Sequence, residues 1–433
     1  MKKALLSIQW MAFIVLANVV YALAIGPMFH LTEMQTMTFL QRTIFILGVG
    51  ALSPLFIGHK LYISEVPSEL WVGVMIIYAG IGQSLFGSDI NTIRVLSFAI
   101  IATGIIIILL SVFGLLDKIL ILFSPRVLAT FLFLLVAELS KDFIIGMFGI
   151  GYKGNHNVSI PIVLVTTGLV ILSLVIRKSK ILSSISFIIV IGVGWITFYL
   201  LGLTTAVPKY TGIFSMPQPF PFGVPLPSAS MIPSIIIAVF VLISTMLAAV
   251  NVIRALLEKA NNHSYDISVK KGGIALGINQ VLAGVFFSVA AVPGISVVGF
   301  MEQTNSTKKL PFLIGNILVV IVSLVTPIMA FFTTLPTPVA YAAIFTVFSN
   351  LFGVGIKELN KIENKEKIYF TIGIPVFAGM GIMFVPNSAF LNLPITLTSF
   401  LSNGLVVGIT LALIIEIYDL IGLKLKNLKK KEI

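Results

Sequence analysis

Three charged side chains stand close together inside one long apolar stretch of the chain. Glu138, Lys141 and Asp142 are spaced i, i+3 and i+4, which places them on one face of a helix. An ionisable group at the centre of a bilayer costs roughly 2.5–3.5 kcal/mol on insertion scales, so each needs a physical reason. The three charges either neutralise one another near a membrane boundary or serve in gating or proton transfer, and Glu138 is the candidate for that second role.

Asn251 and Glu302 are two further polar side chains with candidate roles. An amide within an apolar helix needs a partner on another helix or in a cavity, so Asn251 is a candidate contact for a small molecule. Glu302 closes a short segment at 294–303, where it is either solvated at the inner boundary or a second candidate proton carrier.

The chain shows no pattern typical of an enzyme. The four histidines lack the i, i+4 partner of a zinc site, there are no cysteines, and the P-loop pattern is missing. We therefore expect no metal and no cofactor. Transport would depend on an ion gradient or run downhill.

The composition indicates which elements must position these groups. Of 433 residues, 58% are apolar and 10% are charged, whereas soluble domains carry roughly 25% charged residues. We therefore expect a polytopic helical membrane protein within a lipid bilayer, in which about fourteen spans of about 20 residues would take roughly 280 residues. The expected spans cover 4–28, 37–57, 69–86, 94–114, 119–149, 159–177 and 181–203, and then 234–256, 273–292, 294–303, 312–333, 336–353, 369–386 and 396–423.

A proline-rich stretch divides the chain into two parts. Its prolines exclude a helix, so 206–233 is expected to be an extracellular connection between a first repeat, 1–205, and a second, 234–433. The net charge of +12 follows the positive-inside rule, because basic residues gather at alternate connections. The rule predicts a multi-pass protein of the cell membrane with both termini cytoplasmic. Because the rule accounts for the positive charge, we expect no binding of nucleic acid.

Both halves are interrupted at their third element. The first half has an irregular stretch at 58–64 with Pro67 near the helical start, and the second has Pro293-Gly294 before a segment too short to cross alone. Paired interruptions of this kind indicate an inverted-repeat transporter, whose half-helix N-termini present N–H groups to a ligand. The alternative is that Pro293-Gly294 is a tight turn between ordinary helices.

With these features the chain resembles the nucleobase:cation symporter-2 (nucleobase/ascorbate transporter) family, which contains uracil, xanthine and purine permeases. The residues that carry the resemblance are Gln9 and Ala17, Pro54–Ile63, Phe123–Pro125, Ala137–Leu139, Gly146-Met147, Gly277, Gly284–Ser288, Gly299 and Thr304.

The chain departs from the family at the substrate-binding positions. Leu247 stands where the family has a glutamate, and Asn251 where it has a histidine one turn later. Ser296, Val297 and Asn305 replace three residues of the family signature. The resemblance thus implies the fold, but the carboxylates with which the family binds its substrate are replaced by other residues in this chain.

The implied fold is an all-α polytopic membrane protein with 14 transmembrane segments as two inverted 7-segment repeats. Its third and tenth segments are short and broken, and elements 1–4 and 8–11 form a core domain beside a gate domain. We expect a permease that imports a nucleobase, with a purine preferred, by proton symport and alternating access. The expected substrate contacts are Ala17, Leu61, Tyr62, Ile63, Leu247, Asn251, Ile295 and Ser296.

Three alternatives to this function stay open. An anion transporter of the sulfate-permease type resembles the same architecture, a uniporter would need no co-transported proton, and a membrane scaffold would carry nothing. The resemblance also implies a homodimer as a candidate assembly.

Overall fold

Helices make up most of the computed structural model, which describes residues 2–116, 124–179, 182, 186–295, 297–304, 307–362, 368–390 and 393–429. Up to residue 200 the main elements are α1 (Lys2–Ile25), η1 (Gly26–Phe29), α2 (Glu33–Ile57), β1 (Glu65–Pro67), α3 (Glu69–Phe86), α4 (Asp89–Val112), α6 (Pro125–Met147), α7 (Ile160–Ile176) and α8 (Ser186–Leu200). After it come α9 (Ile232–Asn261), α10 (Val269–Phe286), β2 (Ala291–Pro293), α11 (Val297–Thr304), α12 (Lys309–Leu324), α13 (Thr326–Phe332), α14 (Thr337–Asn360), the π-helix η6 (Tyr369–Gly373), α15 (Ile374–Met383), α16 (Ile395–Leu401) and α17 (Gly404–Lys429).

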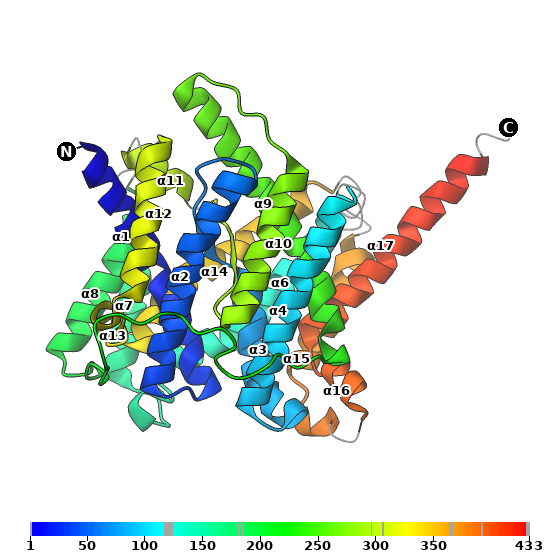
Figure 1. The fold of residues 1–433 in the computed structure, drawn as a ribbon. Coiled ribbons are helices and arrows are strands. Elements are labelled where there is room, and N and C mark those ends of the chain that lie inside the picture. The colour runs from blue at the N-terminus through cyan, green and yellow to red at the C-terminus, as the bar shows by residue number, and fades with distance from the viewer. Residues whose placement is uncertain are drawn as a thin grey trace.

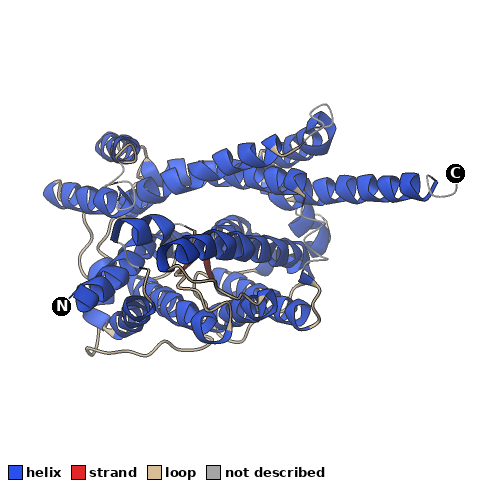
Figure 2. Cartoon of the chain, turned by 90° about the horizontal axis from the view of Figure 1, so that it is seen from above, coloured by secondary structure: helices blue, strands red, loops and turns tan. Residues whose placement is uncertain are grey.

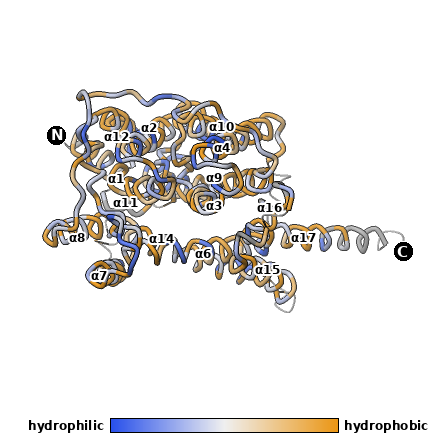
Figure 3. The backbone as a smooth tube through the Cα atoms, turned by 90° about the horizontal axis from the view of Figure 1, so that it is seen from below, coloured by the Kyte–Doolittle hydropathy of each residue, from blue (hydrophilic) through white to orange (hydrophobic). Residues whose placement is uncertain are grey.

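The helices form two layers, which Figures 2 and 3 show edge-on. The first layer contains α1 to α4 and α9 to α12, and its main contacts join α4 to α10 and α12 to both α1 and α2. The second layer contains α6, α7, α8, α14, α15 and α17, with α6 packed against α14 and α17. The layers meet where α1 touches α14 and where α3 touches α6.

Glycines let the first layer pack backbone against backbone. A Cβ atom on Gly104 of α4 would lie 2.5 Å from the carbonyl oxygen of Gly277 on α10, and one on Gly277 would lie 2.6 Å from that of Gly104. Small residues at helix contacts are typical of membrane bundles, where close packing rather than burial from water drives association.

The helices have the length and composition of a membrane protein. Within the described part of the chain, five helices are long and apolar enough to cross a bilayer: Lys3–Phe29, Glu33–Ile57, Glu69–Phe86, Asp89–Val112 and Ala229–Asn261. A sixth candidate is α13 with the start of α14, bent by 76°. Figure 1 places the start of α1 and the end of α17 at the same side of the bundle.

Three expected spans are wrong as continuous helices. Span 273–292 ends early, because α10 stops at Phe286 and Phe287 takes a left-handed conformation with φ 40°. Span 312–333 is two helices, because Val325 is extended and Pro327 cannot continue the helical hydrogen bonds. Span 396–423 is also two helices, since the Asn403 side chain accepts the Val406 N–H and starts a new one. Parts of 119–149 and 181–203 lie outside the described residues.

Within the proline-rich stretch 206–233, residues 206–228 are non-helical, but helical structure begins earlier than expected, with a 3₁₀ turn at Ala229–Met231 and α9 at Ile232. This connection crosses the end of the first layer opposite the termini (Figure 1) and is bound to it by backbone hydrogen bonds. Ser215 N–H donates to Leu324, Phe220 N–H donates to Val285, and Leu226 N–H donates to Arg94. The connection is therefore an ordered part of the first layer's surface.

Candidate substrate site

The two interrupted segments meet in the first layer as a short antiparallel strand pair. Glu65, Val66 and Pro67 of β1 pair with Pro293, Val292 and Ala291 of β2. Two further bonds extend the ladder, from Gly294 N–H to the Ser64 carbonyl (3.0 Å) and from Ser68 N–H to the Ala290 carbonyl (2.7 Å). The pair therefore joins two segments that lie more than two hundred residues apart in the sequence.

Each strand leads directly into a helix N-terminus. The Ser68 side chain accepts the Trp71 N–H and caps α3, while α11 begins at Val297, four residues after β2. A helix start has free N–H groups and a partial positive charge, which suit the acceptor atoms of a ligand. In Figure 3, α3 and α11 lie on the side of the first layer that faces the second layer.

Two adjacent amides on α10 hold this junction in place. Gln280 is fully buried; its Nε2 donates to the Ala291 carbonyl (2.6 Å), and its Oε1 accepts the indole N–H of Trp71 (3.0 Å). Asn279 donates to the Gly50 carbonyl (2.9 Å) and accepts from the Ser53 hydroxyl (2.9 Å). These bonds tie α10 to α2, α3 and β2. Our sequence analysis missed both amides, although two neighbouring amides inside an apolar span were a usable signal.

Two carboxyl groups at the first interruption were also missed. Glu65 lies on β1 and is 1% exposed, and Glu69 lies in the first turn of α3 and is half-buried. The signal was present, since both are ionisable residues two positions from Pro67, at the interruption that leads into the expected span 69–86.

The predicted contacts at 61–63 are mostly buried. The side chains of Leu61 and Ile63 lie in the core, and the Leu61 N–H already donates to Nδ1 of His59 (3.1 Å). Tyr62 is half-buried, and its ring packs near those of Tyr265 and Phe312. A ligand could thus reach this segment at Tyr62 more readily than at its two neighbours.

The remaining predicted contacts lie on three elements of the first layer. Ala17 on α1 and Leu247 on α9 are half-buried, and Asn251, one turn after Leu247, is exposed. Ile295 is 43% exposed just before α11. Ser296 lies outside the described residues, and of Glu302 only the backbone, within α11, is described.

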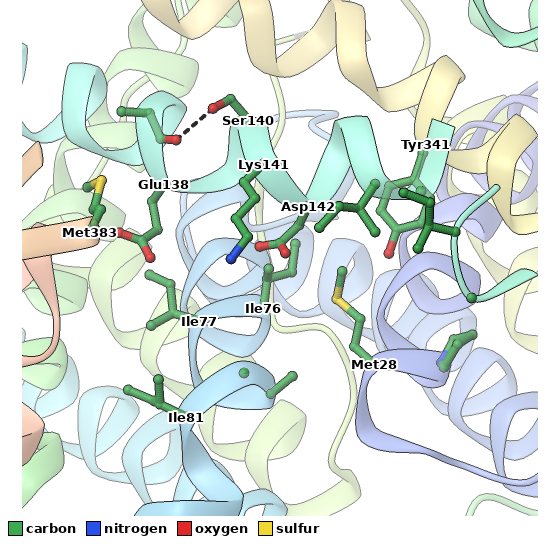
Figure 4. A pocket seen from close by; sticks show the side chains of 18 of the residues that line it. Met28, Ile76, Ile77, Ile81, Glu138, Ser140, Lys141, Asp142, Tyr341 and Met383 are labelled. Atoms are coloured by element: carbon green, nitrogen blue, oxygen red, sulfur yellow. Dashed lines mark hydrogen bonds between the residues drawn. The ribbon is translucent and has the colours of Figure 1, made fainter. Parts of the chain in front are cut away.

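A cavity of about 1190 Å³ lies between the layers (Figure 4). Its wall on the second layer carries Glu138, Lys141 and Asp142 of α6, which point towards Ile76 and Ile77 of α3 across the space. Its lining also includes Met28 and His30, which follow α1, so it opens near the end of the bundle opposite the termini.

The cavity and the strand pair are separate places. None of the predicted contacts Ala17, Leu61, Tyr62, Ile63, Leu247, Asn251 or Ile295 lines the cavity. Ile76 is seven residues beyond Glu69 on α3, which is roughly 10 Å along a helix. The charged trio is therefore not part of the junction.

Contacts near the cavity fix α14 against α1 and α6. The Tyr341 hydroxyl donates to the Ala24 carbonyl (3.0 Å). A Cβ atom on Gly146 of α6 would lie 2.1 Å from the Tyr341 ring, so only glycine allows the two helices to approach this closely. Lys141 forms no ion pair with Glu138 or Asp142 in the described structure, so the expected neutralisation is not by direct contact.

Comparison with known proteins relates this arrangement to a family of permeases. The family model for xanthine and uracil permeases, described as "Permease family", matches residues 1–388. The chain is 34% identical over 427 residues to "Putative purine permease YwdJ" of Bacillus subtilis, covering 97% of this chain and 96% of that one. It is 26% identical over 429 residues to "Xanthine permease" of the same organism, covering 98% and 95% of the two chains.

Two solved structures share the fold at low identity. The transmembrane domain of the cyanobacterial bicarbonate transporter BicA superposes with a TM-score of 0.62 at 15% identity, covering 87% of this chain and 96% of that one. The murine Slc26a9 anion transporter superposes with a TM-score of 0.63 at 13% identity, covering 96% of this chain and 68% of that one. These likenesses show the architecture of an all-α membrane transporter.

Proposed function

The chain belongs to the xanthine/uracil permease family, and we propose that it imports a purine nucleobase across the cell membrane. The observation that carries this proposal is the match to YwdJ at 34% identity over nearly the whole of both chains. Relatives named as xanthine and uric acid permeases support the same substrate class, since both solutes are purines. The anion transporters share the fold at 13–15% identity, which carries no argument about the substrate.

We propose the fourteen-segment arrangement of two inverted repeats, 1–205 and 234–433, for this fold. The antiparallel β1–β2 pair supports it, because each strand precedes a helix start within its own half. In this proposal the first layer is the core domain, the second layer is the gate domain, and both termini are cytoplasmic.

The proposed solute site lies where α3 and α11 begin and face the second layer. Tyr62, Ala17 and Leu247 would surround a planar ring, and Asn251 and Ser296 would give side-chain hydrogen bonds. The buried side chains of Leu61 and Ile63 would support this wall from behind, so their contribution is limited to the backbone. Neutral donors and acceptors suit an uncharged heterocycle better than an anion.

Alternating access would move the first layer against the second, with the proton gradient as the driving force. The inter-layer cavity supports such a movement, because it leaves open space between α3 of the first layer and α6 of the second, and we propose this space as the path from the end opposite the termini. Glu138 would take part in closing this path, and Glu302 stays a candidate at the inner end of α11.

Uptake of radiolabelled adenine, guanine, xanthine, urate and uracil by cells or proteoliposomes tests the proposal. We expect at least one purine to be taken up, and its uptake to fall when the proton gradient is collapsed. Sulfate and bicarbonate are tested in the same assay, as solutes of the alternative anion transporter. Uptake of an anion with no purine uptake would overturn the proposal, and purine uptake indifferent to the gradient would replace symport by uniport.

A single substitution tests the placement of the solute. Asn251→Leu should raise the KM for the purine severalfold without changing the amount of protein in the membrane, and Val252→Ala, at the next and equally exposed position of α9, is the matched control. An unchanged KM in Asn251→Leu would remove that residue from the site.

A further inference from the structure

Glu65 is a carboxyl group buried without a partner at the centre of the first layer. The residue is 1% exposed, and neither carboxylate oxygen has a hydrogen-bond partner among the described residues. No ion pair in the described structure includes it either. Buried polar groups are normally satisfied, so this one needs an explanation.

Among the described residues, the elements around β1 place no counter-charge in contact with Glu65. Those packed against it are α1, α2 and β2. Their described titratable or charged side chains are Lys3 and Tyr21 on α1 and Glu33 and Arg42 on α2, with His59, Lys60, Tyr62 and Glu69 close to β1 in the chain. None of these bonds to Glu65: the Arg42 Nε donates to the Phe287 carbonyl, and His59 Nδ1 accepts from Leu61.

The nearest amide is already engaged. A Cβ atom on Gly50 would lie 3.3 Å from Cγ of Glu65 and 3.3 Å from Nδ2 of Asn279, so the two side chains border the same point of α2. Asn279, however, donates to Gly50 and accepts from Ser53. It therefore completes neither a hydrogen-bond shell for a carboxylate nor an oxygen cage for a metal cation.

An ionised carboxylate in such a place is strongly disfavoured, because no described group replaces its lost hydration. The neutral acid is the form that this packing tolerates. For the carboxyl to ionise, the region around β1 must open to water. Protonation of Glu65 is thus tied to the arrangement of the strand pair.

We propose that Glu65 is the group that binds the co-transported proton. The proposal rests on the proposed nucleobase symport and names the residue that couples it. A proton from water on the outer side adds to one carboxylate oxygen, and the same proton leaves to water on the inner side when the carboxylate is hydrated again. Because Glu65 pairs with Pro293, proton occupancy bears directly on the segment that leads through Gly294 into the proposed solute site.

Purified protein in proteoliposomes provides the test, with the radiolabelled purine of highest uptake among adenine, guanine, xanthine and urate as the probe. An inward gradient of one pH unit, about 1.4 kcal/mol, supports about tenfold accumulation of a neutral base with one proton. We expect wild type to approach that ratio. Glu65→Gln should accumulate the purine only to a ratio of about one, while exchange of labelled for unlabelled purine across the membrane stays within about twofold of wild type.

Glu416→Gln is the matched control, because Glu416 is also buried (7% exposed) but has the Arg126 guanidinium at 3.6 Å. It should accumulate the purine as wild type does. Tenfold accumulation in Glu65→Gln would overturn the inference, as would accumulation in wild type that follows a sodium gradient instead of the proton gradient. Absence of purine exchange in wild type would instead overturn the proposed function itself.

A second measurement does not depend on the folding of a variant. Dicyclohexylcarbodiimide reacts with protonated carboxyl groups in apolar surroundings, and mass spectrometry locates the adduct. We expect the adduct at Glu65 in wild type, with less of it as the external pH rises. An unlabelled Glu65 beside labelled membrane carboxyls would count against the proposal.

Discussion

The two interruptions of the helical fold differ in what they contain. The first, 58–68, carries His59 and Glu65, whose Nε2 and carboxylate oxygens are buried without described partners. The second, 287–295, has no ionisable side chain at all. Its backbone is held from outside, by Arg42 at the Phe287 carbonyl, Thr43 at the Val289 N–H and Gln280 at the Ala291 carbonyl.

The two interruptions therefore have different tasks, although they occupy corresponding positions in the two halves of the chain. The second interruption is anchored by the side chains of α2 and α10, so it sets the geometry of the strand pair. The first brings its own titratable groups to the same strand pair, so it alone can respond to protons. Substitutions at the second interruption should therefore change stability, whereas Glu65 should change coupling.

The largest effect is expected from Gln280→Leu. The change leaves the Trp71 indole N–H and the Ala291 carbonyl buried and unpaired, at about 1–3 kcal/mol each, so about 2–6 kcal/mol of stability should be lost. Thermal unfolding in detergent measures the loss. Gln83→Leu, at an exposed position of α3, should stay within about 0.5 kcal/mol of wild type. Equal melting temperatures for the two variants would refute the anchoring role.

Gly294→Ala should cost about 1–3 kcal/mol, because the new Cβ would lie 2.6 Å from Cγ1 of Val66 and push the strands apart. Val66→Ala in the same chain should recover part of the loss, since the two residues are in contact. Gly80→Ala is the control, as nothing lies within 4 Å of its Cβ position. Strict additivity in the double variant would contradict the close approach.

Thr43→Val should cost about 1 kcal/mol. Valine has the same shape, but the Val289 N–H loses its acceptor, and the bond of 3.3 Å places the effect at the low end of the range. Thr38→Val, whose hydroxyl bonds only to the Gln35 carbonyl within α2, is the comparison in the same melting experiment. A greater loss in Thr38→Val than in Thr43→Val would speak against the anchor.

Ser288→Ala should have the smallest effect, within about 0.5 kcal/mol of wild type, because the buried Ser288 hydroxyl has no described partner to lose. Gradient-driven purine uptake should also be unchanged. Both results would contrast with those for Glu65, which also has no described partner but carries an acidic proton. A defect in uptake would show that the second interruption also takes part in coupling.

The presence of both interruptions could be predicted from glycine and proline alone, but the start of the second could not. Gly58 and Pro67 bound the first interruption, whereas α10 already ends at Phe286, well before Pro293 and Gly294. The breaks at Val325 and Asn403 were missed even though Pro327 and the Asn403-Gly404 pair signalled them. Both breaks lie within long apolar stretches. The mean hydropathy of such a stretch predicts one continuous span, because a single helix-breaking residue hardly changes it.

The candidate site was harder to predict than the fold. Leu61 and Ile63 were chosen as backbone contacts, but the strand itself begins later, at Glu65, because its register depends on pairing with a segment that lies far away in sequence. Asn279 and Gln280 act through partners on α2, α3 and β2, and no local pattern shows such partners. Glu65 was visible as a charge just before the expected span 69–86, but only the packing shows that no described residue neutralises it.

The connection between the two halves has a mechanical consequence. Just before it, the Leu203 carbonyl accepts a hydrogen bond from the Tyr152 hydroxyl, between α6 and α7 of the second layer. Further on, Ser215 is bonded to Leu324 at the end of α12 in the first layer, and Ile213 to Thr326 at the start of α13. Residues 204–212 make no such backbone bonds, and these nine residues extend at most roughly 30 Å. A shift of one layer past the other can therefore leave the bonded ends of this segment in place, whereas the break of at most four residues between α13 and α14 gives those two helices far less freedom to separate.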